Sequence, residues 1–149
     1  MTRFGYDPTH SGLVSALGES VSIGLPLVGL LIDKSGGELR YCAGASVLTI
    51  VAHMLLLCTM TRPEIPIVIL ATSAGIVPTV VFALVGKNLS DSLGTAFAVM
   101  ELTHGLGLVL GNIVVGYLHD HLGGYPAVIS FLLALACLDL LLSLGLMRG

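Results

Sequence analysis

Long apolar stretches, separated by short polar segments, run through the whole chain of 149 residues. A bilayer crossing needs about 20 consecutive and mostly apolar residues, which is the length of each stretch. Helices of soluble proteins instead combine one apolar face with a charged face. The pattern therefore predicts an all-α fold, a polytopic transmembrane helical bundle with five spans, at residues 11–32, 41–60, 65–86, 95–118 and 127–147.

Two of these spans, the first and the fourth, gather their polar residues on one side. At about 100° per residue, Glu19 shares an arc of the first span with serines and glycines, opposite a row of Leu and Val. Glu101, His104 and Asn112 share the corresponding arc of the fourth span. We expect such helices to turn the polar arc towards other helices or an aqueous cavity, and the apolar arc towards lipid.

Composition supports the membrane assignment and excludes other classes. Only 10% of residues are charged and 55% are hydrophobic, with a mean hydropathy of +1.00, whereas soluble domains carry about 25% charged residues. The chain has no basic patch, so we expect no nucleic-acid partner. Its cysteines, Cys42, Cys58 and Cys137, lie in apolar stretches without metal-ligand spacing. The polar first residues do not resemble a cleaved leader, and no cofactor motif is present.

Glu19 and Glu101 are the strongest candidates for binding a substrate or a proton. A charged carboxylate in hydrocarbon is unfavourable by roughly 2.5–3.5 kcal/mol on insertion scales, so it needs a partner, a proton or water. Burial favours the neutral form, so either group could exchange protons or pair with a substrate ammonium. The structural alternative is a protonated Glu bonded to a neighbouring helix. His104 could relay protons with Glu101 or simply pack, and Asn112 could line a cavity or bridge helices.

The remaining polar residues favour structural roles. His53 and Asp139 are isolated within their spans, which favours packing or local pairing. His119 and His121 flank Asp120 in an expected solvated turn. A single Glu-x-x-His pair is present, whereas di-metal bundles use two, so no metal site is predicted. Without a Ser–His dyad, paired Asp residues or a His-Glu-x-x-His set, we expect no enzyme.

The turn between the first two spans reads Gly29-x-x-x-Asp33-Lys34-x-Gly36, with Arg40 four residues later. An Asp at a helix end, a Lys, and glycines able to take positive φ predict a short, rigid hairpin. The pattern resembles the signature loop of major facilitator superfamily transporters. In that family the loop's Asp and basic residues form a conformational latch, and the resemblance implies this role for the five residues named here.

This turn also departs from the family pattern, in which two basic residues usually follow. Gly37 and Glu38 stand at those two places, which weakens the expected latch. Four of the six Lys and Arg residues lie on the side of this turn, and Arg3 and Arg62 lie on the other. Because cytosolic loops are enriched in Lys and Arg, we expect the turn in the cytosol.

Other features agree with the second half of such a transporter. The opening Phe4-Gly-Tyr-Asp-Pro loop leads into a Ser/Gly-rich span, and the five spans resemble helices 8 to 12 of a fold built from two six-helix halves. The fourth span, from Gly94-Thr-Ala to Gly116, is followed by Asp120 in a short turn. That sequence is similar to the lysosomal dipeptide transporter branch of the superfamily.

The resemblance implies transport of a small solute by alternating access, with the substrate site near the bilayer midplane between the halves. Five spans cannot build that site, so we expect residues 1–149 to form a single partial unit whose missing helices lie N-terminal to Met1. The chain would then be a fragment or a truncated product.

The narrower branch implies dipeptide or amino-acid export from a lysosome-like compartment, a location in the lysosomal membrane and an accessory membrane glycoprotein. The alternatives are another carrier of the superfamily, for sugars or organic anions, or a membrane scaffold that does not transport.

Overall fold

The computed structural model describes residues 6–58 and 62–148, and within these ranges it contains helices and turns but no strand. Its helices are α1 (Pro8–Val21), α2 (Leu25–Ser35), α3 (Glu38–Cys58), α4 (Glu64–Asn88), α5 (Leu93–His121) and α6 (Tyr125–Leu146), with short 3₁₀ turns η1 (Ser22–Gly24) and η2 (Ser90–Ser92). Five helical segments are long and apolar enough to cross a membrane, with α1, η1 and α2 forming the first. The predicted fold class is confirmed. Arg3, the opening residues Phe4-Gly5 and the expected end of the second span at residue 60 lie outside the described ranges.

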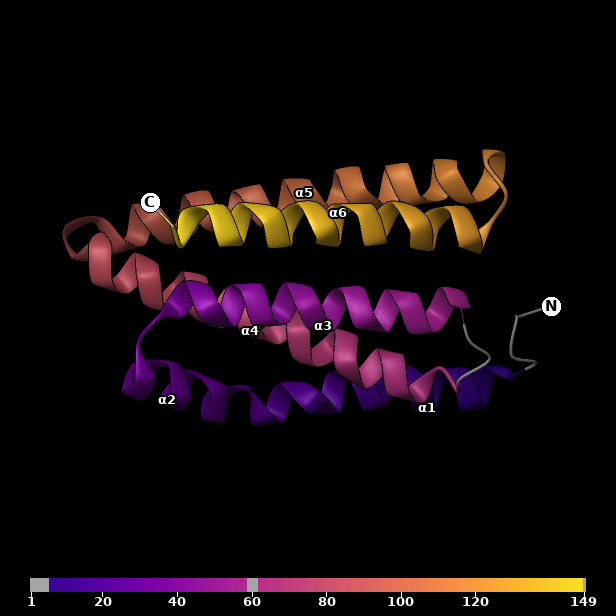
Figure 1. Ribbon diagram of the computed structural model, residues 1–149, viewed down its shortest axis with the longest axis horizontal. Helices are drawn as coiled ribbons and strands as arrows, with labels where there is room; N and C mark the ends of the chain where they lie inside the picture. Colours follow the sequence, from indigo (N-terminus) through magenta and orange to yellow (C-terminus); the bar gives the residue numbers. More distant parts are fainter. Residues whose placement is uncertain (1–5, 59–61, 149) are drawn as a thin grey trace.

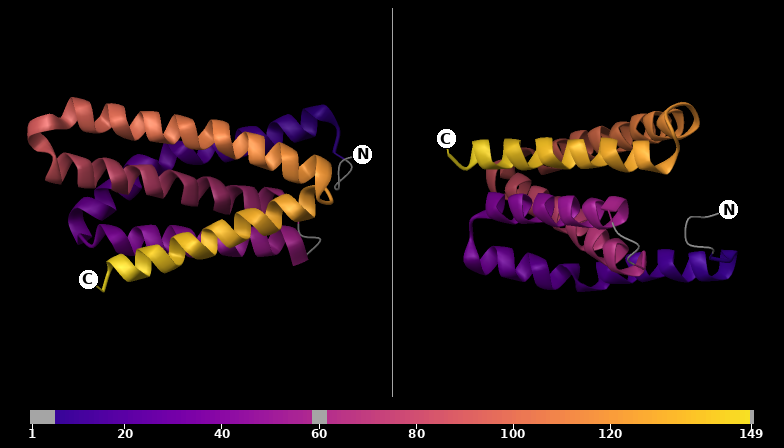
Figure 2. Two further views of the ribbon diagram at one scale, coloured as in Figure 1. Left: turned by 90° about the horizontal axis from the view of Figure 1, so that it is seen from above. Right: turned by 45° about the vertical axis from the view of Figure 1, so that its right-hand side comes forward.

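The helices are arranged in layers along one long axis. α3 and α4 lie in the middle, α1 and α2 on one side and α5 and α6 on the other (Figure 1). α3 packs closely along both α4 and α6, whereas α5 makes looser contacts with α4 and α6 (Figure 2). The first span and α5 are therefore the least enclosed parts of the bundle.

The first span is interrupted near its centre. The 3₁₀ turn Ser22–Gly24 separates α1 from α2, and Pro26 stands at the beginning of α2. Proline has no N–H for a helical hydrogen bond and disfavours α-helical geometry in the residue before it, so the chain tightens there. The first span is therefore broken just before Pro26. α4 runs without interruption through Pro78.

A small core joins α2, α3 and α4. Ile32, Ala45, Ile76 and Val80 are between 0% and 9% exposed and form one cluster. Alanine in this cluster lets the helix backbones approach closely, as is usual in membrane bundles. The core holds α2, rather than α1, to the rest of the molecule.

Polar side chains inside the bundle find partners on neighbouring helices. The Thr49 hydroxyl of α3 donates to Ser73 Oγ of α4 at 2.9 Å, and the Ser46 hydroxyl donates to Asp139 Oδ2 of α6 at 2.5 Å. Because lipid offers no hydrogen bonds, such pairs satisfy groups that would otherwise be unpaired. They also fix how α3 sits against both neighbours.

The turn between α2 and α3 is shorter than expected. α2 ends at Ser35 and α3 begins at Glu38, so Asp33 and Lys34 lie in the last turn of α2 and the expected 34–40 loop is reduced to two residues. Gly36 and Gly37 have φ values of +63° and +73°, which confirms the predicted need for glycine.

The expected boundary of the fourth span is wrong by one helical turn. The sequence predicts a turn containing His119, Asp120 and His121, but α5 continues to His121. The chain instead turns at Gly123 and Gly124, whose φ values are +104° and +75°. Nothing in the His-Asp-His segment prevents helix formation, whereas the two glycines readily adopt left-handed geometry.

Candidate functional site

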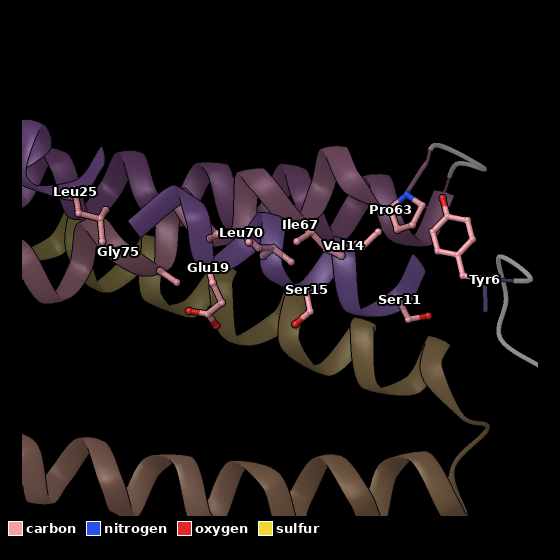
Figure 3. Close-up of a pocket in the computed structure, with 13 residues that line it drawn as sticks. Tyr6, Ser11, Val14, Ser15, Glu19, Leu25, Pro63, Ile67, Leu70 and Gly75 are labelled. Atoms are coloured by element: carbon pink, nitrogen blue, oxygen red, sulfur yellow. The ribbon is translucent and has the colours of Figure 1, made fainter. Parts of the chain in front are cut away.

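A groove of about 720 Å³ lies between α1 and α4 (Figure 3). This volume is within the range of roughly 300–1,000 Å³ found for small-molecule sites. Ser11, Ser15 and Glu19 line its α1 wall. These residues are spaced by four, so the helix places them on one face. The α4 wall carries apolar side chains, including Ile67 and Leu70.

Leu25 and Gly75 close one end of this α1–α4 groove, and Tyr6 and Pro63 line the other (Figure 3). A Cβ atom at position 75 would lie only 2.9 Å from Leu25 Cγ and closer still to its methyl groups. Real Cβ atoms do not approach other atoms so closely, so glycine at this position permits the contact. The closed end is therefore a tight contact between α2 and α4.

Glu19 gives the groove a carboxyl group. It is exposed on α1 and points to the same side of the helix as Ser15 (Figure 3). Of the described residues that line the groove, Glu19 alone has a carboxyl side chain. Its carboxylate can accept hydrogen bonds from a cationic group or take up a proton, while the α4 wall offers apolar contact to the rest of a ligand.

The three candidate residues of α5 lie elsewhere. Glu101, His104 and Asn112 are exposed and do not line the groove, and α5 is separated from α1 by the α3–α4 layer (Figure 1). No hydrogen bond joins Glu101 to His104 within the described part of the chain, and no residue of α5 there is buried. The structure does not bring these residues to Glu19, and their predicted binding roles stay predictions.

The isolated polar residues of other helices have local partners, as expected. His53 is 6% exposed, and its Nδ1 lies 2.7 Å from the Thr49 carbonyl oxygen one turn earlier. Asp139 accepts the hydrogen bond from Ser46 already described. Across residues 6–58 and 62–148 no group of three or more His, Cys, Asp or Glu side chains is placed to hold a metal ion.

The signature turn carries an ion pair that sequence reasoning missed. Lys87 Nζ, at the end of α4, lies 3.3 Å from Glu38 Oε1, at the start of α3. Asp33, Lys34 and Arg40 enter none of the ion pairs in the described ranges. Glu38 stands where the family pattern has a basic residue. The ion pair therefore joins the turn to the end of α4, with the acid, rather than the base, on the side of the turn.

A second missed cluster joins α1 to α4 at the opposite end of the bundle, next to the open end of the groove. The Tyr6 hydroxyl donates to Glu64 Oε1 at 2.9 Å, and His10 Nε2 lies 3.5 Å from the same oxygen. The Tyr6 and His10 rings are 4.1 Å apart between centroids. Partial burial raises the pKa of Tyr6, and the hydrogen bond to Glu64 raises it further, so its hydroxyl stays protonated as a donor. We call these residues the Tyr6–His10–Glu64 cluster.

Comparison with known proteins finds similarity to proteins that are named as transporters. It is 28% identical over 141 residues to the lysosomal dipeptide transporter MFSD1 of Danio rerio and 29% identical over 141 residues to that of Homo sapiens, covering 93% of this chain in both. For the Mus musculus protein of the same name, identity is 29% over 143 residues and 95% of this chain. The chain is a homologue of MFSD1. The resemblance to a major facilitator superfamily transporter, and to its lysosomal dipeptide branch, is confirmed.

The match covers only part of each relative's length. The chain spans about 30% of the length of the Danio rerio and Homo sapiens proteins. No protein-family model and no solved structure matches it. Homology to MFSD1 and five helices able to span a bilayer together establish a multi-pass integral membrane protein.

Proposed function

We propose that this chain is part of a major facilitator superfamily carrier that moves dipeptides or amino acids out of a lysosome-like compartment by alternating access. Its MFSD1 homologues are named lysosomal dipeptide transporters, and its helices form a membrane bundle. In this proposal the α1–α4 groove is one wall of the substrate path. A second set of helices, present in carriers of this superfamily, supplies the other wall.

The single observation that carries this proposal is the placement of Glu19 in the groove. A dipeptide has an ammonium group at one end and apolar or polar side chains along its length. Glu19 can receive the ammonium group or a coupled proton, Ser11 and Ser15 can accept and donate hydrogen bonds, and Ile67 and Leu70 can contact side chains. Glu101, His104 and Asn112 of α5 do not line this groove, and their substrate or proton role is a separate part of the proposal.

The test is uptake by the complete protein reconstituted in liposomes, with dipeptides, sugars and carboxylates offered in parallel. We expect dipeptide flux, reduced about tenfold by Glu19→Gln, which corresponds to about 1.4 kcal/mol of lost binding. Asp139→Asn is the matched control, because it removes an acid that already has a local partner in Ser46. That control should retain flux.

Each other outcome favours a different function. Flux of sugars or organic anions without dipeptide flux would assign the chain to another carrier of the superfamily. No flux of any solute, with the protein folded, would favour a membrane scaffold. Equal flux in wild type and Glu19→Gln would remove Glu19 from the substrate path.

Two further features belong to this proposal. The latch role of Gly29, Asp33, Lys34, Gly36 and Arg40 would be shared with the Glu38–Lys87 ion pair, which joins the turn to α4 on one face of the membrane. The accessory membrane glycoprotein implied by the resemblance would be detected by co-purification of the complete protein from lysosomal membranes.

A further inference from the structure

The Tyr6–His10–Glu64 cluster joins the first turns of two helices, α1 and α4, that pack along each other. α1 begins at Pro8 and α4 begins at Glu64, and both helices run from this end of the bundle towards the α2–α3 turn. Tyr6, a member of the cluster, and Pro63, which precedes Glu64, also line the end of the groove that lies away from Leu25 and Gly75. Only Val14 is buried in α1, so the helix is weakly packed below the cluster.

The charged and titratable groups around His10 are few. Glu64 faces it from α4, with its Oε1 oxygen at 3.5 Å. Asp7 accepts a hydrogen bond from the His10 backbone N–H at 2.6 Å, and the Tyr6 ring packs against the imidazole. Arg62, just before α4, lies near enough to Tyr6 to oppose the rise in its pKa. Among the residues that the structure describes, His10 thus has the carboxylates of Asp7 and Glu64 beside it, and Arg62 lies near Tyr6.

Glu64 itself has unused capacity to accept a hydrogen bond. Its second oxygen, Oε2, is buried and has no hydrogen-bond partner among the described residues. A buried carboxylate oxygen without a donor is unfavourable, and positive charge nearby offsets this. Protonation of His10 would place such a charge beside the carboxylate.

We infer that the Tyr6–His10–Glu64 cluster is a pH-dependent contact that holds the start of α1 against α4 at the open end of the groove. With neutral histidine, the Tyr6 hydrogen bond and the ring contact remain, and His10 can form at most a neutral hydrogen bond with Glu64. Imidazolium adds an ion pair with Glu64. Histidine ordinarily changes its charge between pH 5 and 8. The added attraction is therefore present below that range and is lost as the pH rises through it. An acidic compartment would favour the closed contact. This inference concerns the first turns of two helices and does not depend on which solute is carried.

The experiment measures the distance between these two helix ends. Spin labels are attached at Thr9→Cys and Ile65→Cys, both exposed positions in the first turns of α1 and α4, after the three native cysteines are replaced by Ala. The full chain is placed in lipid nanodiscs, and distance distributions are recorded by double electron–electron resonance at pH 7.5 and pH 5.0. The population at the short distance should rise by about two- to fivefold at pH 5.0, the size expected for a partly exposed ion pair.

Variants assign this change to the cluster. His10→Gln should give the same distribution at both pH values, close to that of wild type at pH 7.5. His10→Lys, which keeps a positive charge, should give the short distance at both. His121→Gln is the matched control, because His121 lies at the same end of the bundle but contacts Tyr117 instead. It should retain the full response.

Two results would overturn the inference. One is a wild-type distribution that does not change between the two pH values. The other is a response that persists in His10→Gln or disappears in His121→Gln. The comparison of His10→Lys with His10→Gln also separates charge from folding, because both variants remove the imidazole. Dipeptide flux enters none of these measurements, so their failure would leave the proposed carrier function standing.

Discussion

Polar residues have different surroundings in the middle of the bundle and in its two outer polar helices, α1 and α5. In α3, α4 and α6, hydroxyl and carboxylate groups are paired across helices, as Ser46 is with Asp139 and Thr49 with Ser73. In α1 and α5, Glu19 and Glu101 lie on exposed faces. The first group fixes helices against one another, whereas the second lies on exposed helix faces of the described structure. Polarity inside a membrane segment therefore points to function mainly where the surrounding helices leave it exposed.

The glycines of the two regions differ in the same way. A side chain at Gly75 would collide with Leu25, whereas a side chain at Gly107 of α5 would meet nothing within 4 Å. Glycine in α4 therefore serves close packing between described helices. At the glycines of α5, by contrast, an added Cβ atom would meet no described atom within 4 Å.

The largest effect that tests this contrast should come from Gly75→Val. The new side chain forces Leu25 and the α2 backbone away from α4, and such overpacking reduces stability by about 1–3 kcal/mol. The free energy of unfolding of the full chain in mixed micelles measures it. Gly107→Val is the matched control and should change stability by less than about 0.5 kcal/mol. An equal loss in both variants would mean that α5 is packed as tightly as α4.

A smaller effect is expected for the hydrogen bond between α3 and α6. Ser46→Ala and Asp139→Asn, alone and combined, form a double-mutant cycle for that bond. Interhelical hydrogen bonds in membranes contribute on average about 0.6 kcal/mol and at most about 1.7 kcal/mol, so we expect a coupling energy in this range. Glu101→Gln, measured by the same unfolding assay, should leave stability unchanged. Zero coupling between Ser46 and Asp139 would contradict the view that this pair fixes the middle helices against one another.

The smallest effect should come from the ion pair at the signature turn. The Lys87 side chain is 70% exposed, and exposed pairs contribute about 0–1 kcal/mol. Glu38→Gln should therefore reduce the free energy of unfolding by about 0.5 kcal/mol or less, and the loss should vanish at 1 M salt, where charges are screened within about 3 Å. Exchanging the two charges, with Glu38→Lys and Lys87→Glu together, should restore stability. A loss that persists at high salt would show that Glu38 acts by packing.

Much of the fold could be predicted from the sequence because hydrophobic length is a local property. Five helical segments lie over the five predicted apolar stretches, and those ends that the structure describes differ from the predicted ones by about one helical turn or less. The positive φ values of the glycines in the signature turn could also be predicted, since few other residues adopt positive φ. The extra helical turn at the end of α5, residues 119–121, was missed because polar residues at a membrane surface fit a helix end as well as a loop.

Pairings between distant residues could not be predicted in this way. Helical periodicity assigns Asp139 to a face of α6, but it does not say that Ser46, 93 positions earlier, lies opposite. Tyr6 and Glu64 are likewise 58 positions apart. The polar arc of α1 correctly indicated a face with Glu19, while the groove depends on which side chains α4 presents. The placement of α5 away from α1 was equally absent from the pattern.

The connection between α2 and α3 has a consequence for movement in this bundle. With only Gly36 and Gly37 between the helices, and Tyr41 Oη within 2.6 Å of Ser35 Oγ across the turn, little chain is available to absorb a displacement. A shift of α2 would therefore be transmitted to α3. α1 is joined to α2 through the 3₁₀ turn instead, and it packs along α4. The first membrane crossing thus consists of two halves that are coupled to the bundle differently: α2 through the short turn to α3, and α1 through α4.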